Sequence, residues 1–323
     1  MNADRARTGA GPELRFDPLL REWVNVVGHR QRRPNLPTEV CPFCPGGLEA
    51  PEPYDVRWFP NRWPALSPGA AIDTAAAEAA GTVSLPAVGA TEVVLFAPRH
   101  DASLATLGVA QVRKVVDLWA ERTAALLARP EVEYVLVFEN RGRERRCDDR
   151  PSARPDLRVP VRSARARQGR RGRALPRLPG VRRGAGRARG GRARRRPPWR
   201  LGRVRPVRVG LPVRDADRAR PHHGSLADLA DDSRDALSAL LVDALGRYDR
   251  LWPPPEPGYL FPYLLWFHQA PATGGDEWHV HAHTAPPLRA PGVQRYVASG
   301  ELGSGTLSNP VVPEDAAKAL RDA

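Results

Sequence analysis

The chain has 323 residues, a formal net charge of +14 and 41% hydrophobic residues, which suits about two globular domains. No run of about 18 apolar residues occurs, and the first residues, MNADRARTGAG, lack an apolar core, so the sequence predicts neither a membrane span nor a secretory signal. Three cysteines argue against a disulfide scaffold. We therefore expect a cytoplasmic globular protein.

The first predicted element is a strand near Trp23 to Val27, which leads into the basic run HRQRRP. Arg30 and Arg33 lie in this run, and Asn61 follows in FPNRWPAL. Guanidinium groups bind phosphate through paired hydrogen bonds, so a phosphate site is one interpretation. A solvated basic turn is the other, and the pattern leaves the choice open.

A CPFC motif places Cys41 and Cys44 among turn-forming prolines, ahead of a Pro/Gly-rich loop over Pro45 to Pro53. Two thiolates at this spacing can share one tetrahedral metal ion, so zinc is the favoured interpretation. A redox pair, which usually opens a helix, and a motif without a role are the alternatives. His100 is the natural third ligand if the chain folds back on this loop; otherwise it is a loop residue that caps the next helix.

A long helix and a buried strand follow in the first half, after a leading strand over Glu92 to Ala97. Apolar residues recur at intervals of three and four, as on one face of a helix, at Val112, Val115, Val116, Trp119, Thr123 and Leu126. The continuous apolar run YVLVFEN, which ends at Asn140, predicts a strand in the middle of a sheet beneath that helix.

The segment Arg145 to Arg220 differs from the rest of the chain. Its 76 residues hold 27 Arg and 5 Asp but no Lys, Glu, His, Phe, Tyr, Ile, Thr or Asn, a composition that cannot form a packed core. Its charge is +22 (27 minus 5), so the flanks carry −8 (14 minus 22). A genuine segment of this kind would be disordered and bind RNA or other polyanions. Alternatively, it is GC-rich coding sequence read out of frame.

Codon degeneracy favours the out-of-frame interpretation. If synonymous codons for Arg145 to Arg165 are read in a frame that starts one nucleotide later, they can encode VGVTIDHPHAQIYAYPFVPPV. This string is strand-like and contains a histidine cluster. The same shift permits HCPVC at Arg173 to Leu178, GAWVAFVPFAS at Trp199 to Val209 and YEMRIAP at Val213 to Ala219. We therefore expect residues 145–220 to be out of frame and disordered, between a truncated N-terminal half over 1–144 and a C-terminal half over 221–323.

The second half repeats the pattern of the first about 122 residues later. Arg99 and His100 precede Ser103 and Leu104, and His222 precedes Ser225, Leu226 and Leu229 in the same way. A second helix starting near Ser233 and ending before Pro253 to Pro255 is predicted from the spacing of apolar residues, at Leu237, Leu240, Leu241, Ala244, Leu245, Tyr248 and Leu251. The strand YLLWFHQ, which ends at Gln269, follows it. Each half therefore repeats one unit of helix and strand.

A histidine cluster follows in WHVHAH, where alternation puts His279, His281 and His283 on one face of a strand. His268 would reach the same face from the neighbouring strand. Imidazoles grouped in this way bind a metal or a phosphate, and a structural role is the alternative. If the halves are duplicates, the equivalent place in the first half holds Pro151 and Ala153, where the shifted frame has HPH.

The motifs together resemble galactose-1-phosphate uridylyltransferase, a family of the histidine-triad superfamily. The resemblance covers residues 16–144 and 222–323, through DPLLREWVNVVGHRQRRP, CPFC, FPNRWPAL, the run from APRHDASL to FENRG, FHQAP, HVHAHTAPPLR and NPVVPEDAAKALR. It implies an α+β fold of two duplicated histidine-triad-like halves, each a mostly antiparallel sheet with a long helix. It also implies transfer of UMP between UDP-glucose and galactose 1-phosphate through a uridylyl-histidine intermediate, and a homodimer.

The resemblance also implies roles for individual residues. Arg30 and Arg33 resemble phosphate contacts, Asn61 and Asn140 resemble nucleotide contacts, and Arg295 and Glu301 lie where the family contacts nucleotide and sugar. The implied metal ligands are Cys41, Cys44 and His100 for zinc, and His268, His281 and His283 for a second metal, iron or zinc.

The chain departs from the family at the nucleophile. The family attacks phosphorus with the second histidine of HPH, binds zinc with the first and contacts phosphate with the following glutamine; the printed chain has none of these near Pro151 to Ala153. A further carboxylate ligand of the second metal would also fall in the Arg-rich segment. We expect this polypeptide to be inactive and poorly folded, and the intact gene product to be a uridylyltransferase.

Two other functions compete with this interpretation. Another histidine-triad enzyme, such as a phosphorylase acting on dinucleoside polyphosphates, would lack the duplicated half and the CPFC motif. Nucleic-acid binding rests on the Arg-rich segment alone, and that segment has a single aromatic residue, Trp199, for stacking bases. Nucleic acid is therefore the disfavoured partner.

Overall fold

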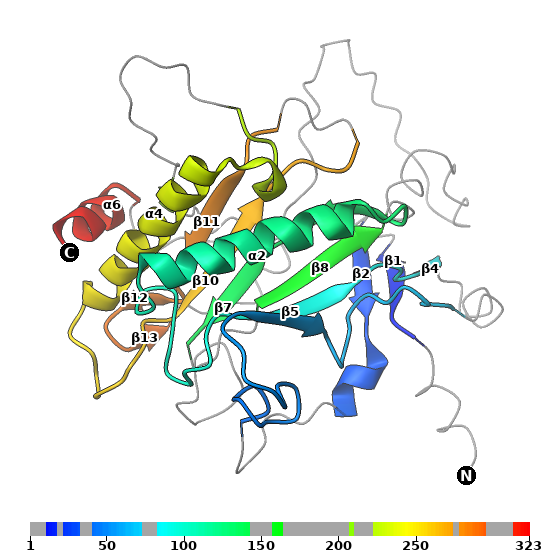
Figure 1. Cartoon of the computed structure of the whole chain (residues 1–323), viewed down its shortest axis with the longest axis horizontal. Coiled ribbons are helices and arrows are strands. Elements are labelled where there is room, and N and C mark those ends of the chain that lie inside the picture. Colours follow the sequence, from blue (N-terminus) through cyan, green and yellow to red (C-terminus); the bar gives the residue numbers. More distant parts are fainter. Residues whose placement is uncertain are drawn as a thin grey trace, which may run out of the picture.

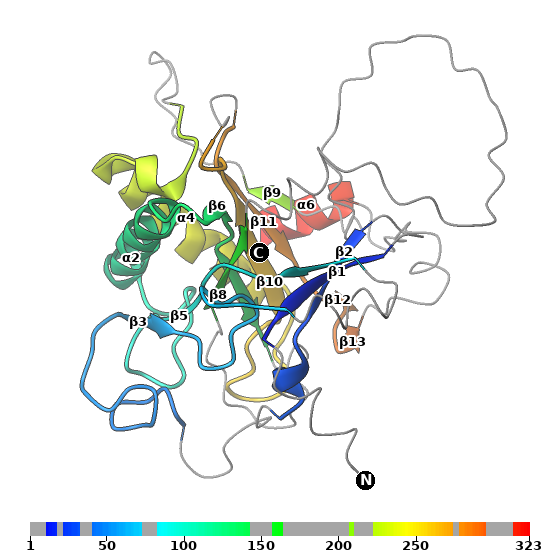
Figure 2. The same cartoon turned by 90° about the vertical axis from the view of Figure 1, so that its right-hand side faces the viewer.

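A computed structural model describes residues 11–17, 22–32, 41–72, 83–142, 157–163, 207–209, 222–273, 278–294 and 313–323. Its larger part consists of two four-stranded antiparallel sheets covered by two long helices (Figure 1). The two turned views agree that α2 (Val109–Leu127) and α4 (Asp231–Arg250) lie on the same side of these strands (Figures 1 and 2). The predicted α+β class is confirmed. No helix in the described ranges has the length and apolarity that crossing a membrane requires.

The first large sheet has the order β3-β5-β8-β6 and the second has the order β7-β10-β11-β9. Their strands are β3 (Arg57–Pro60), β5 (Thr91–Leu95), β8 (Leu157–Ser163), β6 (Val132–Val135), β7 (Phe138–Arg141), β10 (Tyr263–His268), β11 (His281–Ala285) and β9 (Val207–Val209). Each half thus supplies an equivalent run of three strands: β5-β8-β6 in the first and β9-β11-β10 in the second.

The run YVLVFEN forms two strands and not the single strand predicted. β6 pairs with β8, whereas β7 pairs with β10, so the chain changes partner between Val135 and Phe138. The backbone N–H of Phe267 donates to the carbonyl of Val137 at 2.9 Å within this break. This mainly apolar segment therefore connects the sheets of the two halves.

The predicted helices are present, with one boundary corrected. All six residues of the predicted apolar stripe of α2 are buried. The second helix begins at Asp231, before the predicted Ser233, because Asp231 and Asp232 provide negative charge in the first turn, where the helix dipole favours it. Asp232 also accepts a hydrogen bond from the backbone N–H of Ser233 at 2.8 Å. The helix ends at Arg250, before the predicted proline stop.

The core lies between the helices and the sheets. Trp119 of α2 is 1% exposed, and its ring meets Phe96 of the first half at 5.9 Å and Phe267 of β10 at 5.4 Å. A buried ion pair joins α2 to β5, where Arg122 donates to both carboxylate oxygens of Glu92 at 3.0 and 2.9 Å. The Arg122 guanidinium also lies 3.5 Å from the Trp58 ring centroid.

Two strands fall inside the Arg-rich segment, where disorder is predicted. β8 pairs with both β5 and β6, and β9 pairs with β11. In β8, Leu157, Val159 and Val161 alternate with other residues, a spacing that suits a strand. The ten residues of these strands (7 plus 3) therefore differ from the expected disorder. The remaining predictions for 145–220 lie outside the described residues.

Smaller elements complete the fold. A three-stranded antiparallel sheet has the order β2-β1-β4, and β12 and β13 form a hairpin. These elements are β1 (Glu13–Asp17), β2 (Glu22–Val26), β4 (Ser84–Pro86), β12 (Leu288–Ala290), β13 (Val293–Gln294), the 3-10 helices η1 (Gly28–Arg32) and η3 (Leu226–Asp228), and the helix α6 (Pro313–Asp322). Arg247 of α4 donates to the Leu320 carbonyl at 3.1 Å, which attaches α6 to the core.

Candidate active site with two metal-ligand groups

The CPFC motif forms a compact turn that brings three metal-ligand residues together. Donor atoms of Cys41, Cys44 and His100 all lie within 4.8 Å of one another, and Cys44 Sγ is 3.4 Å from His100 Nδ1. The backbone N–H of Cys44 donates to the Cys41 carbonyl at 3.3 Å. Two thiols and an imidazole are the donor set that zinc prefers, so these residues fit the metal that the sequence predicts.

The rest of the loop holds the turn in place. Gly47 has no room for a side chain, because an added Cβ would lie 2.5 Å from the Cys41 carbonyl oxygen. The Tyr54 hydroxyl donates to the carbonyls of Phe43 and Ala97 at 2.7 and 3.1 Å, which ties the loop to the segment preceding His100. The turn is not the start of a helix, which argues against the redox alternative.

The second group joins three histidines across two strands. His268 and His281 are directly opposed in the β10–β11 pair, and His283 is opposed to Trp266. Their donor atoms lie within 4.8 Å of one another, and the ring centroids of the three pairs are 4.9 to 5.2 Å apart. The prediction that His268 reaches the histidine face from the neighbouring strand is confirmed.

His279 does not join this group, although alternation predicts three histidines of HVHAH on one strand face. β11 begins only at His281. The next residue after His279, Val280, donates its backbone N–H to the His223 carbonyl at 2.8 Å. The ring of His279 therefore lies near His222, at 5.3 Å between centroids.

Burial lowers the pKa of His268 to about 4, with a further contribution from the nearby His281. His268 is therefore neutral at physiological pH, the form that binds a metal. His281 Nδ1 lies 2.8 Å from the His279 carbonyl, which can only accept, so Nδ1 carries the proton and Nε2 offers a lone pair. Three imidazoles whose donor atoms lie this close together fit a divalent transition metal.

Asn140 lies on the same sheet face as the histidines. It is opposed to Leu264 on β10, and residues directly opposite each other share a face. Leu264, Trp266 and His268 follow one another at intervals of two along that face. Asn140 therefore lies on the sheet face that carries the second metal-ligand group.

The other predicted substrate residues are less clustered in the described part of the chain. Asn61 directly follows β3, and its Oδ1 accepts from the backbone N–H of Trp63 at 2.8 Å. Arg30 is half-buried on η1. Arg33, Arg295 and Glu301 lie outside the described residues, as do Pro151 and Ala153.

A buried polar network lies beneath Asn140, on the helix side of the sheet. The Tyr263 hydroxyl donates to Glu139 Oε2 at 3.1 Å, and Arg141 pairs with Asp249 of α4. Desolvation raises the pKa of Glu139 to about 7, and the charge of Arg141 only partly opposes this. The motifs in the sequence did not predict this network. The signal for it was the pair of charged residues, Glu139 and Arg141, on either side of Asn140 in an otherwise apolar strand.

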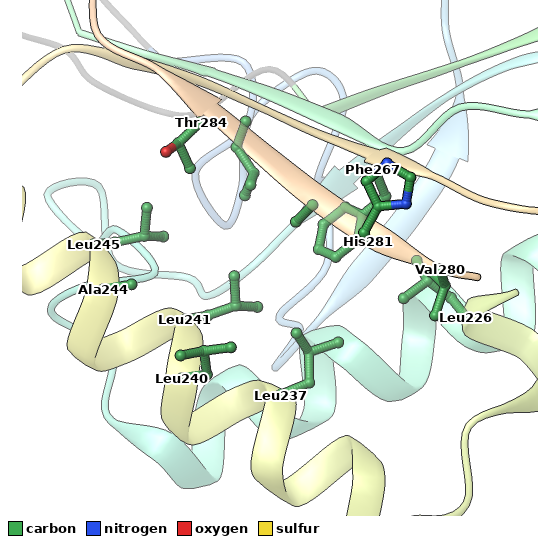
Figure 3. A pocket seen from close by; sticks show the side chains of 12 residues that line it. Leu226, Leu237, Leu240, Leu241, Ala244, Leu245, Phe267, Val280, His281 and Thr284 are labelled. Atoms are coloured by element: carbon green, nitrogen blue, oxygen red, sulfur yellow. The ribbon is translucent and has the colours of Figure 1, made fainter. Parts of the chain in front are cut away.

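The cavity between α4 and the second sheet is not a substrate site. Figure 3 shows aliphatic side chains of α4, among them Leu237, Leu241 and Leu245, facing β11. The cavity has a volume of about 20 Å³, room for roughly one water molecule. It is a small gap in the packing of α4 against the sheet.

Two duplicated sheets with covering helices, a Cys–Cys–His group and a triple-histidine face define a histidine-triad-like protein of the nucleotide-transferring class. Residues 3–223 match the model of the galactose-1-phosphate uridyl transferase N-terminal domain. A galactose-1-phosphate uridylyltransferase of Thermotoga maritima is 30% identical, over 96% of this chain and 98% of the relative. The chain therefore belongs to the galactose-1-phosphate uridylyltransferase family, whose members are transferases.

Two further comparisons agree with this assignment. A solved uridylyltransferase structure has a TM-score of 0.66 and 23% identity, with 96% of this chain and 98% of that chain covered, and shows the same fold. An ADP-glucose phosphorylase of Arabidopsis thaliana is 26% identical over 41% of this chain and 44% of its own length. The family is thus related to a phosphorylase of nucleotide sugars.

Proposed function

We propose that the intact gene product is a UDP-glucose:hexose-1-phosphate uridylyltransferase acting on UDP-glucose and galactose 1-phosphate. An imidazole nitrogen bonds to the α-phosphorus of UDP-glucose as the bond to the departing glucose 1-phosphate breaks. A phosphate oxygen of galactose 1-phosphate then displaces the imidazole and forms UDP-galactose. A covalent intermediate lets one site serve two similar sugar phosphates in turn, and such transfers depend chiefly on positioning and charge neutralisation.

The main support for this proposed function is the Cys–Cys–His group. Within the described ranges this group has three donors, one short of the four that a closed zinc site uses. The resemblance assigns the fourth ligand to the first histidine of HPH and the nucleophile to the second, so one short stretch would supply both. The printed chain has Pro151 and Ala153 there. We therefore propose that this polypeptide lacks the nucleophile and binds zinc weakly.

The shifted frame is compatible with strand β8. Over Leu157–Ser163 it permits YAYPFVP, whose Tyr, Phe and Val residues are common in strands. The shifted HPH would then end at residue 153, four residues before β8. In the second half the histidines stand at the start of β11, the equivalent strand.

The remaining residues take supporting roles. Arg30 and Arg33 neutralise phosphate, Asn61 and Asn140 hold the nucleotide, and Arg295 and Glu301 contact nucleotide and sugar. Zinc at Cys41, Cys44 and His100 would hold the HPH stretch in place. His268, His281 and His283 would bind the second metal, iron or zinc. Homodimer formation is proposed from the family resemblance alone.

Expression of two versions of the protein tests the proposal: the printed chain, and a version with residues 145–220 read in the shifted frame. UDP-galactose formation from UDP-glucose and galactose 1-phosphate is measured for both. The restored version should turn over, and the printed chain should be slower by several orders of magnitude. A restored version that keeps alanine at position 153 should be equally inactive. Robust turnover by the printed chain would refute the missing nucleophile.

A phosphorylase of nucleotide sugars is the second candidate, favoured by the similarity to the ADP-glucose phosphorylase. The restored protein is incubated with ADP-glucose and inorganic phosphate. Release of ADP at a rate above that of uridylyl transfer would favour this candidate over the first.

A further inference from the structure

The three histidines of the second metal-ligand group differ in what holds their ring nitrogens. His281 is prepared for metal binding, because its Nδ1 proton is directed to the His279 carbonyl at 2.8 Å and Nε2 keeps its lone pair. His268 is held differently. The indole N–H of Trp266 donates to His268 Nε2 at 2.9 Å.

This hydrogen bond uses the one lone pair with which His268 could bind a metal. An indole N–H is a donor only, so Nε2 must be the acceptor and the single proton of the neutral imidazole must be on Nδ1. Coordination through Nε2 would displace the indole directly. Coordination through Nδ1 would move the proton to Nε2, which then could not accept from the indole. Either way, a metal and Trp266 cannot use His268 together.

Trp266 also contacts a second member of the group. Its ring is stacked on the His283 imidazole, with 5.3 Å between centroids and 6° between planes. The strand register explains both contacts. Trp266 is directly opposed to His283 on β11, and it precedes His268 by two residues on β10, so all three side chains share one sheet face.

We propose that Trp266 competes with the metal for His268, so that the second metal site alternates between an indole-capped state and a metal-bound state. In the capped state, His281 and His283 are the members of this histidine group that can act as ligands. Metal binding must break the indole–imidazole hydrogen bond, which lowers the affinity of the site. The proposal concerns metal binding only and does not depend on uridylyl transfer.

Replacement of the indole by a ring without an N–H tests this competition. Trp266→Phe keeps an aromatic ring against His283 and removes the donor to His268. All measurements are made in a Cys41→Ser, Cys44→Ser background, so that zinc titrated against a chelator reports the histidine site. Trp266→Phe should tighten zinc binding by roughly 2- to 10-fold, the equilibrium equivalent of one neutral hydrogen bond. An affinity that is unchanged or weaker, in a variant with the parent's far-ultraviolet circular dichroism and the parent's unfolding midpoint in urea, would overturn the proposal.

Two further variants separate competition from a general effect of losing a tryptophan. Trp252→Phe removes an indole that packs near Phe261, away from the histidines, and should leave zinc affinity unchanged. In a His268→Ala background, Trp266→Phe should no longer tighten binding, because the contested lone pair is gone. Equal tightening with and without His268 would show that the indole acts in another way.

Nitrogen-15 NMR on the chain without substitutions supplies a measurement that needs no variant to fold. Without metal, His268 should be protonated on Nδ1, with Nε2 as the acceptor. Saturating zinc should bind a nitrogen of His268 and shift the Trp266 indole N–H resonance toward that of a solvent-exposed indole. A proton on His268 Nε2 before zinc is added, or an indole resonance that zinc leaves unchanged, would contradict the capped state.

Discussion

Glu139→Gln should change how the stability of the protein depends on pH. The Glu139 side chain is fully buried, and its Oε2 accepts from the Tyr263 hydroxyl. Arg141, the nearest cation in the network, is already paired with Asp249. The buried carboxyl therefore has too little compensating charge, and its pKa rises from 4.5 to about 7, chiefly through desolvation.

The sign of the effect follows from the direction of this shift. The folded state keeps the proton of Glu139 at pH values where the unfolded state has released it. The resulting stabilisation is complete below pH 4.5 and is lost as the pH rises through about 7. At about 1.4 kcal/mol per pH unit, the parent should lose about 2 to 3 kcal/mol between pH 5 and pH 8 through this group. Glutamine does not titrate and can still accept from Tyr263.

Urea unfolding of parent and variant at half-unit steps from pH 5 to pH 8 measures the effect. The free energy of unfolding of Glu139→Gln, minus that of the parent, should rise with pH by about 2 to 3 kcal/mol. His268 also titrates with a shifted pKa, but it contributes equally to both proteins and cancels in the difference. Glu121→Gln, at a side chain that is 64% exposed, is the matched control for replacing a carboxylate by an amide. A difference for Glu139→Gln that rises no more with pH than that of the control would refute the assignment of a neutral buried carboxyl.

Three further substitutions test the packing that positions the site. Gly47→Ala places a Cβ 2.5 Å from a backbone oxygen of the CPFC loop and should lower the zinc content measured by mass spectrometry. Gly69→Ala is the control, because an added Cβ there has nothing within 4 Å, and it should leave the zinc content unchanged. Equal zinc content in the two variants would contradict the close approach at Gly47. Trp119→Ala should lower the free energy of unfolding in urea by about 3 to 5 kcal/mol, and a loss below about 1 kcal/mol would mean that this ring does not join the two halves. Glu92→Ala leaves Arg122 buried without its main partner and should cost about 3 kcal/mol in the same assay; a neutral effect would show that solvent reaches the pair.

Much of the fold could be predicted because it depends on local periodicity. The helix stripe around Trp119 and the apolar run through Leu265 follow from spacing alone, since a side chain's face is set by its position along the helix or strand. The same reasoning correctly put His268, His281 and His283 on one face. The Cys41–Cys44 spacing likewise predicts a turn that brings two candidate metal ligands together, without knowledge of distant residues.

The sequence by itself therefore determined the two duplicated units, the helices and the identity of both metal-ligand groups. Only the tertiary structure decided where one segment divides into β6 and β7, and that His279 lies outside the histidine group. It also decided that Trp266 contacts His268 and that Glu139 is buried beneath Asn140. These outcomes depend on which strand becomes the neighbour of another and on how deeply a charge is buried. The pairing of β7 with β10 and the contact of Glu139 with Tyr263 join residues more than a hundred positions apart, so local patterns carry no record of them.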